Sequence, residues 1–125
     1  MGDRRLETLS FDNTYGRLPA AFYAKLNPTP FASSPYVVSV NLAAADLLDL
    51  AADEATRPEF AALFGGSMLA AGMDPLAMLY AGHQFGVYVP QLGDGRAILL
   101  GEATNARGER WDLHLKGAGR TPFSR

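Results

Sequence analysis

The sequence predicts an α+β fold, in which helical segments over residues 1–82 precede an antiparallel sheet over residues 83–125. Apolar residues before Gly82 recur mainly at helical spacing, whereas after it short β-favouring runs alternate with glycine-containing turns. The chain has 125 residues, of which 48% are hydrophobic, and this is enough apolar material for a folded core. We therefore expect one domain or a part of one.

The first ordered elements are expected after an irregular start. Leu18, Phe22 and Leu26 are spaced as i, i+4 and i+8, which predicts a short helix over residues 18–26 with one apolar face. Prolines 28 and 30 end it, since each disfavours helical backbone in the residue before it. The β-branched run over residues 36–40 then predicts a short strand.

Three further helices are expected, each marked by a residue that suits a helix start. Asn41 can cap a helix that continues to about residue 55. Thr56 opens a capping box with the glutamate three residues later, and the helix that it begins ends at Gly65-Gly66. Pro75 suits the first position of a last helix, over residues 75–82, because that position needs no N–H donor.

The remaining chain predicts a three-stranded antiparallel meander. The expected strands cover residues 85–90, 97–102 and 111–116, and they are joined by turns over residues 91–96 and 104–110. Alternation along the third strand places Trp111, Leu113 and Leu115 on a face that packs on the core. Asp112, His114 and Lys116 then share the opposite face.

The turn over residues 91–96 has the composition of a phosphate-binding loop. Gly93 and Gly95 lack Cβ atoms, so their backbone N–H groups can approach a phosphate oxygen, and Arg96 adds a planar fork of donors. Lys116 would add an ammonium group to the same ligand. Each feature has an ordinary alternative, because Gly-Asp-Gly is often only a turn and a lysine on a strand is often only solvated.

The order of these elements is more specific than any one of them. A strand, a glycine loop, a second strand, a turn and a strand with a lysine follow one another in the N-lobe of protein kinases, where they clamp a nucleotide. This order predicts a kinase-like N-lobe sheet in an incomplete protein-kinase-like fold. The chain lacks GxGxxG, and His114-Leu115-Lys116 replaces the usual Ala-Ile-Lys. A P-loop is excluded, because Lys116 precedes its glycine within a strand and loop instead of opening a helix.

Other candidate residues favour structural roles. His83 has no carboxylate or cysteine partners at ligand spacing, so we expect it to be structural, just past a helix end, and expect no metal site in the chain. Residues 117–120 could form a second anion-binding turn or simply a flexible loop. The aromatic residues between Phe11 and Tyr23 are expected in the core, since no basic groove accompanies them.

Charge and composition exclude several classes of partner. The formal net charge is −2 and no run of lysine or arginine occurs, which argues against binding to nucleic acid or to an anionic membrane surface. No apolar run reaches the ~18 residues of a membrane span, and the N-terminus lacks the apolar segment of a signal peptide. The absence of cysteine fits a reducing compartment. These observations predict a cytoplasmic protein.

Four blocks of sequence together resemble one known family. They are FDNTYGRLP, YAGHQFG, PQLGDGRAILLGE and WDLHLKGAGRTPFSR, and they resemble the opening of the selenoprotein O family of pseudokinase-fold protein adenylyltransferases. The resemblance implies ATP and Mg²⁺, and transfer of AMP to Ser, Thr or Tyr hydroxyls of proteins. It also implies nucleotide binding by Gly93, Gly95, Arg96 and Lys116. His114 stands where the family has another polar residue such as Gln, and we assign it no catalytic role.

The resemblance further predicts that residues 1–125 are the N-terminal part of a longer adenylyltransferase. In the family, the catalytic residues and the metal ligands lie beyond the point that corresponds to Arg125, so none is expected within this chain. We therefore expect residues 1–125 alone to be inactive. Two alternatives remain at this stage: a nucleotide-binding module without transfer activity, and an inert truncated product.

Overall fold

The computed structural model describes residues 2–125 as a mixed α and β structure with a mostly antiparallel sheet. Five strands form the main sheet: β1 (Ser10–Phe11), β2 (Tyr23–Lys25), β3 (Leu76–Met78), β6 (Ala97–Thr104) and β7 (Arg110–Lys116). A separate hairpin consists of β4 (Gly82–Gln84) and β5 (Val87–Val89). The helices are α1 (Leu42–Leu47) and α2 (Pro58–Phe64), and short 3₁₀ turns cover Leu6–Thr8, Tyr15–Arg17, Ala20–Phe22 and Glu54–Thr56.

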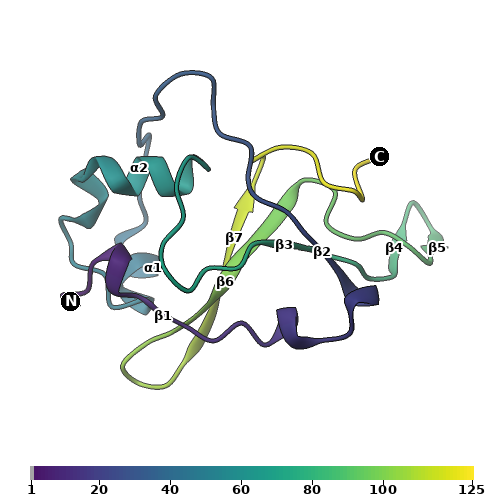
Figure 1. The fold of residues 1–125 in the computed structure, drawn as a ribbon, viewed down its shortest axis with the longest axis horizontal. Coiled ribbons are helices and arrows are strands. Elements are labelled where there is room, and N and C mark those ends of the chain that lie inside the picture. The colour runs from purple at the N-terminus through teal and green to yellow at the C-terminus, as the bar shows by residue number, and fades with distance from the viewer. Residues whose placement is uncertain (1) are drawn as a thin grey trace.

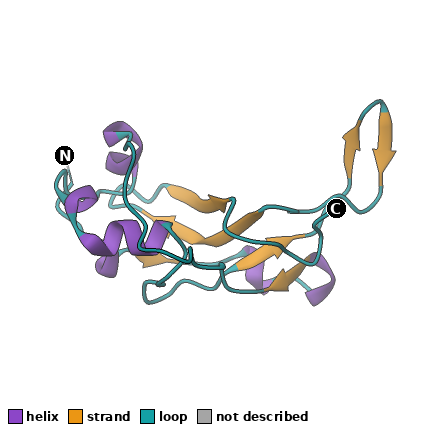
Figure 2. Cartoon of the chain, turned by 90° about the horizontal axis from the view of Figure 1, so that it is seen from above, coloured by secondary structure: helices purple, strands orange, loops and turns teal. Residues whose placement is uncertain are grey.

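Strand β6 is the centre of the sheet, because it pairs with three other strands, all antiparallel. β7 pairs with it over its whole length, from Ala97 opposite Lys116 to Thr104 opposite Arg110. The other edge of β6 is shared by β1 and β3, which pair with its two ends, and β2 pairs with β3. Helices α1 and α2 lie at one end of this sheet and the β4–β5 hairpin projects at the other (Figure 1 and Figure 2).

The core lies between the sheet and the helical end of the molecule. Its fully or almost fully buried members are Leu6, Leu9, Leu50, Leu63, Ala70, Leu100, Ala103, Leu113 and Leu115. They come from both the N-terminal segment and the β6–β7 hairpin, so the two halves of the chain are packed together. Burial of this apolar surface is the main favourable contribution to the stability of the fold.

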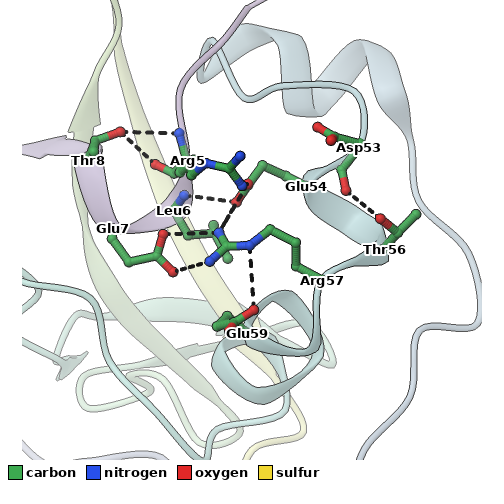
Figure 3. Close-up of polar contacts among 9 residues, drawn as sticks. All are labelled: Arg5, Leu6, Glu7, Thr8, Asp53, Glu54, Thr56, Arg57 and Glu59. Carbon is green, nitrogen blue, oxygen red and sulfur yellow. Dashed lines mark hydrogen bonds and ion pairs between the residues drawn. The ribbon is translucent and has the colours of Figure 1, made fainter.

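Glu54 connects the N-terminal segment to the helices from a buried position. Its carboxylate is 1% exposed and accepts hydrogen bonds from the Leu6 backbone N–H at 3.0 Å and from the Arg57 guanidinium at 2.9 Å (Figure 3). Arg5 donates a further bond at 3.2 Å, and Arg57 also pairs with Glu7 at 2.9 Å. A buried carboxylate is stable only when its oxygens are satisfied in this way. Glu54 therefore holds the first residues of the chain against the 3₁₀ turn before α2.

Two of the predicted helices occur in shortened form. Asn41 caps α1 as predicted, with its side-chain oxygen accepting from Ala44 N at 3.1 Å, but the helix ends at Leu47 and not near residue 55. Asp49 follows with a positive φ of 61°, which a helix cannot continue through. α2 ends before Gly65 as predicted, yet the capping box at Thr56 does not form. Thr56 instead donates to the carbonyl of Asp53 at 2.7 Å.

Two other predicted helices and one predicted strand are wrong. Residues 18–26 contain only a 3₁₀ turn before β2, and residues 75–82 contain β3. These two segments pair with each other, with Tyr23 opposite Met78, so sheet pairing outweighs a weak helical pattern. Residues 36–40 form no strand, and Tyr36 and Val38 are more than four-fifths exposed. The expected helical region before residue 83 is thus in part β-structure.

The predicted meander is correct only for its second and third strands. β6 and β7 form the expected hairpin, whereas the first predicted strand, over residues 85–90, lies mostly in the separate β4–β5 hairpin. Leu113 and Leu115 pack on the core as predicted, but Trp111 is 39% exposed near the start of β7. Among the described residues, no helix has the length and apolar character needed to cross a membrane.

Candidate functional site

The glycine loop, residues 91–96, leads from the β4–β5 hairpin into β6 and is held against β3. The backbone N–H of Gly93 donates to the carbonyl of Tyr80 at 3.1 Å, and that of Asp94 donates to the carbonyl of Met78 at 2.8 Å. Gly93 is buried and has a φ of +65°, in the left-handed region that favours glycine. The first glycine of Gly-Asp-Gly is therefore required by the backbone conformation.

Asp94 anchors this loop from within. Its side chain is 5% exposed, and its two carboxylate oxygens accept from Met78 N at 3.1 Å and from the Tyr80 hydroxyl at 2.9 Å. Burial raises the pKa of Tyr80, and its hydrogen bond to Asp94 raises it further, so this hydroxyl remains a donor. Both oxygens of Asp94 are thus used to hold the loop on the sheet. This carboxylate serves the structure of the loop.

The other side of the loop is covered by residues 121–125, which we call the tail segment. The Thr121 hydroxyl donates to the carbonyl of Asp94, and the Ser124 hydroxyl donates to the carbonyl of Gly95. A Cβ atom added at Gly95 would lie 3.3 Å from the carbonyl oxygen of Phe123, which is a close contact. The glycine loop is consequently enclosed between β3 and the tail segment.

A cavity of about 220 Å³ lies between the glycine loop and the tail segment. It is lined by Leu92, Gly93, Gly95, Arg96, Phe123 and Arg125. The lining residues include two arginines and no aspartate or glutamate, so their charge suits an anion. Three of the four sequence-predicted site residues, Gly93, Gly95 and Arg96, thus meet at one cavity.

Lys116, the fourth predicted residue, does not line this cavity but lies on the neighbouring strand. It is the last residue of β7 and pairs with Ala97, the residue after Arg96, while Gly117 N donates to the carbonyl of Arg96 at 2.9 Å. Its side chain is exposed and, within residues 2–125, forms no hydrogen bond or ion pair. The structure therefore leaves this ammonium unneutralised beside the start of β6.

A larger cavity, of about 410 Å³, lies between α1, α2 and β7 and has a different character. Its lining is mostly apolar, with Asp112 and His114 among its few polar side chains. It contains no arginine or lysine and none of the predicted site residues. We therefore regard the smaller, cationic cavity as the candidate site, because it brings together the groups that bind phosphate.

The remaining candidates of the sequence analysis have structural positions. His83 lies in β4 opposite Tyr88, not beside a helix end as predicted. Gly119 has a φ of +109° and packs closely on Thr29, so the 117–120 turn is partly fixed by contacts. Within the described chain, no group of three histidine or acidic side chains could hold a metal ion.

The sequence analysis missed the tail segment as part of the site. Phe123 and Arg125 line the cavity from positions almost thirty residues after the glycine loop, and the sequence contains no spacing signal that connects them. Asp94 was also missed as an anchor. A buried role could have been suspected from its position between two glycines, but its partners Met78 and Tyr80 lay in a segment predicted to be helical.

Comparison with known proteins identifies the family. Residues 5–125 match the family model of the protein adenylyltransferase SelO. The chain is 64% identical over 120 residues to the protein nucleotidyltransferase YdiU of Myxococcus xanthus, and 58% identical over 120 residues to that of Thiobacillus denitrificans. Each alignment covers 96% of this chain but only 24% of the relative, so the chain spans about a quarter of their length. A match over almost every residue establishes that this chain belongs to the SelO family of protein adenylyltransferases.

Proposed function

We propose that residues 1–125 are the N-terminal part of a protein nucleotidyltransferase, called the full-length protein below, which transfers AMP from ATP to Ser, Thr or Tyr hydroxyls of proteins. Family membership supports nucleotidyl transfer as the general activity. The structural observation that supports ATP as the donor is the cationic cavity at the glycine loop, with Arg96 on its wall and Lys116 on the adjacent strand.

The residues of the cavity fit the phosphate part of a nucleotide. Gly93 and Gly95 allow the backbone to approach phosphate oxygens without a side chain between them. Arg96 offers paired donors, and Lys116 offers a compact charge from the neighbouring strand. We assign these four residues to nucleotide binding. Each of the four residues makes a different kind of contact, so replacing any one of them should weaken ATP binding. The fold should persist in each variant, except that a side chain at Gly93 would strain its left-handed backbone.

The proposed reaction transfers the adenylyl group, that is, the α-phosphoryl group together with its adenosine. The acceptor hydroxyl oxygen forms a bond to the α-phosphorus, the bond from that phosphorus to the oxygen it shares with the β-phosphorus breaks, and pyrophosphate leaves. The hydroxyl proton passes to a base, which we place in the rest of the full-length protein. Mg²⁺ would neutralise phosphate charge, and its ligands are also placed there, since the described residues contain no acidic cluster suited to it. Residues 1–125 would hold and orient the donor.

The proposed partners follow from this reaction. They are ATP and proteins that present a hydroxyl side chain, and we include neither nucleic acid nor a membrane, because the chain has net charge −2 and no basic run. A cytoplasmic location remains a prediction from the composition.

The test replaces Lys116 with alanine in the full-length protein and measures transfer of label from α-labelled ATP to protein in the presence of Mg²⁺. Loss of a charge-assisted phosphate contact costs ~1.5–3 kcal/mol, so we expect labelling to fall roughly tenfold or more. Lys25→Ala is the matched control, because Lys25 is also an exposed strand lysine of the same sheet, and its ammonium contacts Asp74 and the Tyr23 ring at the surface.

Three outcomes separate the possible functions. Reduced labelling by Lys116→Ala, with normal labelling by Lys25→Ala, supports the proposal. Undiminished labelling by a folded Lys116→Ala variant would remove this lysine from the site. Tight ATP binding by the wild-type protein without any transfer of label would instead identify a nucleotide-binding module.

A further inference from the structure

We propose that the tail segment, residues 121–125, acts as a latch that fixes the glycine loop for nucleotide binding and that its Arg125 supplies a second guanidinium to the phosphate site. This inference rests on the proposed function, because it assumes that the cavity receives the phosphates of ATP. It extends that function to Thr121 and Ser124 as positioning residues, which hold the loop without touching the nucleotide.

The latch consists of two hydroxyl groups, each of which donates one hydrogen bond and accepts another. Thr121 Oγ1 donates to the carbonyl of Asp94 and accepts from Phe123 N at 3.1 Å. Ser124 Oγ donates to the carbonyl of Gly95 and accepts from Thr121 N at 2.9 Å. Thr121 is 8% exposed, so its bonds lie largely out of water. The tail segment is therefore folded on itself and bonded to two successive carbonyls of the loop.

These two bonds hold the glycine loop on the side that does not face β3 and the residues after it. The Asp94 carboxylate and the backbone N–H groups of the loop bond to Met78 and Tyr80. The carbonyls of Asp94 and Gly95 are instead bonded to the tail segment. A loop with two glycines loses much conformational freedom when it is ordered, and a ligand that orders it pays that cost from its binding energy. The latch reduces this cost before the ligand arrives.

Arg125 gives the tail segment a second role. It lines the same cavity as Arg96, and its guanidinium donates to the side-chain oxygen of Gln84 in β4. Gln84 is uncharged, so this contact orients Arg125 without neutralising it. No aspartate or glutamate lines the cavity, and its two arginines belong to the loop and to the tail segment. In the proposal, an anion in this cavity would be bound by both arginines.

The experiment removes the latch while leaving the cavity lining unchanged. In the full-length protein, the double variant Thr121→Val/Ser124→Ala deletes both hydroxyls, and ATP affinity is measured by titration calorimetry. Ordering one loop residue costs about 1–2 kcal/mol, so we expect the dissociation constant for ATP to rise about fivefold or more. Amide hydrogen exchange of residues 92–96 without nucleotide should become faster, which is the readout specific to a latch.

Two matched control variants separate the effect of the latch from a general loss of stability. Thr121→Ser/Ser124→Thr keeps both hydroxyls and should retain the wild-type affinity. Ser67→Ala removes a comparable bond, from Ser67 Oγ to the carbonyl of Ala62 at 3.0 Å, at a distance from the cavity, and should leave ATP affinity unchanged. If the double variant does not fold, Ser124→Ala alone is compared with Ser67→Ala.

Arg125 is tested separately by Arg125→Gln and Arg125→Lys. We expect Arg125→Gln to weaken ATP binding about tenfold and Arg125→Lys to weaken it less, because the charge is kept and only the paired donors are lost. Arg107→Gln, in the exposed β6–β7 turn, is the control for loss of an arginine and should bind as the wild type does.

The results distinguish this inference from the proposed function. If the wild type binds ATP and the latch variants bind it equally well with unchanged exchange, the latch is refuted while nucleotidyl transfer stands. If the variants lose affinity but the wild type transfers no AMP, the latch stands and the proposed reaction is refuted. Absence of ATP binding by the folded wild-type protein would overturn both.

Discussion

Alanine substitution of the two loop glycines should have different consequences, because the structure gives them different reasons for being glycine. Gly93 has a φ of +65°, and a Cβ atom there would lie 3.1 Å from the carbonyl oxygen of Met78. A left-handed conformation costs an L-residue about 1–2 kcal/mol, and the close contact adds to this cost. We therefore expect Gly93→Ala to lower the unfolding free energy of the full-length protein by about 2 kcal/mol.

Gly95 differs, since its φ is not in the left-handed region and its added Cβ would lie 3.3 Å from the carbonyl oxygen of Phe123. We expect Gly95→Ala to cost less than about 1 kcal/mol of stability. Its larger effect should be on ATP, because the methyl group would obstruct the approach of phosphate to the backbone. Loss of one such contact corresponds to ~1.5–3 kcal/mol, which is a tenfold or greater loss of affinity.

Gly108→Ala is the control that isolates the free-energy cost of a left-handed backbone conformation. Gly108 has a φ of +78° in the β6–β7 turn, and a Cβ atom there would meet nothing within 4 Å. It should lose stability through its φ alone and bind ATP normally. Denaturant unfolding and ATP titration of the three variants give the comparison. Wild-type stability in Gly93→Ala would refute the assignment of backbone strain to Gly93. Wild-type ATP affinity in Gly95→Ala would refute the assignment of a ligand contact to Gly95.

Three further predictions follow from other parts of the structure. Glu54→Ala should destabilise the protein by at least about 1–3 kcal/mol, because the buried N–H of Leu6 loses its acceptor. The hydrogen-exchange rate of that amide should rise, and an unchanged rate would contradict the anchoring role of Glu54. The pKa of Glu102 is lowered, because hydrogen bonds from Thr14, Tyr15 N and Arg110 outweigh the opposing effect of burial. Its stabilising contribution is therefore present above its ordinary pKa of 4.5 and is lost as the pH falls through the lowered value, so the decline in unfolding free energy between pH 5 and 3 should be smaller in Glu102→Gln. Residues 1–125 alone should transfer no AMP from labelled ATP with Mg²⁺ to a protein acceptor, and robust Mg²⁺-dependent labelling would show that the base and metal ligands are misplaced.

The parts of the fold that could be predicted from the sequence are those with strong local signals. The β6–β7 hairpin has a continuous apolar run and an alternating run around a turn with Asn105 and Gly108, and both strands form as predicted. Asn41 caps α1, and Gly65-Gly66 ends α2, because these residues act through bonds within a few positions. Local chemistry is sufficient at such sites.

The wrong predictions concern segments whose structure depends on distant partners. Residues 75–82 have the composition and the proline of a helix, but Leu76 is 1% exposed and lies between β2 and β6. Residues 36–40 have the β-branched composition of a strand but no partner strand within the described chain. A strand needs a neighbour to satisfy its backbone groups, and composition does not indicate whether one is present.

The candidate site divides in the same way. The glycine loop and Arg96 could be recognised because they are contiguous and have a phosphate-binding composition. The tail segment could not be recognised, since its hydroxyl groups act on the loop across a gap of almost thirty residues. Whether Lys116 and the loop serve one ligand stays a prediction, as the structure brings them to neighbouring strands but not to the same cavity.

The position of Lys116 relative to Arg96 depends on the register of the β6–β7 hairpin. Ala97 faces Lys116 at the end of β7, and a shift of one residue would turn the lysine side chain to the core face. The register is set at the far end, where the Asn105 side chain accepts from the N–H groups of Arg107 and Glu109 and donates to the carbonyl of Leu47. Asn105 is 4% exposed, so the turn is fixed to the helical end of the molecule. A bulge between Leu99 and Gly101 then shifts the pairing, so that Lys116 lies opposite Ala97 at the cationic end. The alignment of the two proposed phosphate-binding cations is therefore determined by the polar turn at the opposite end of the same hairpin together with this bulge.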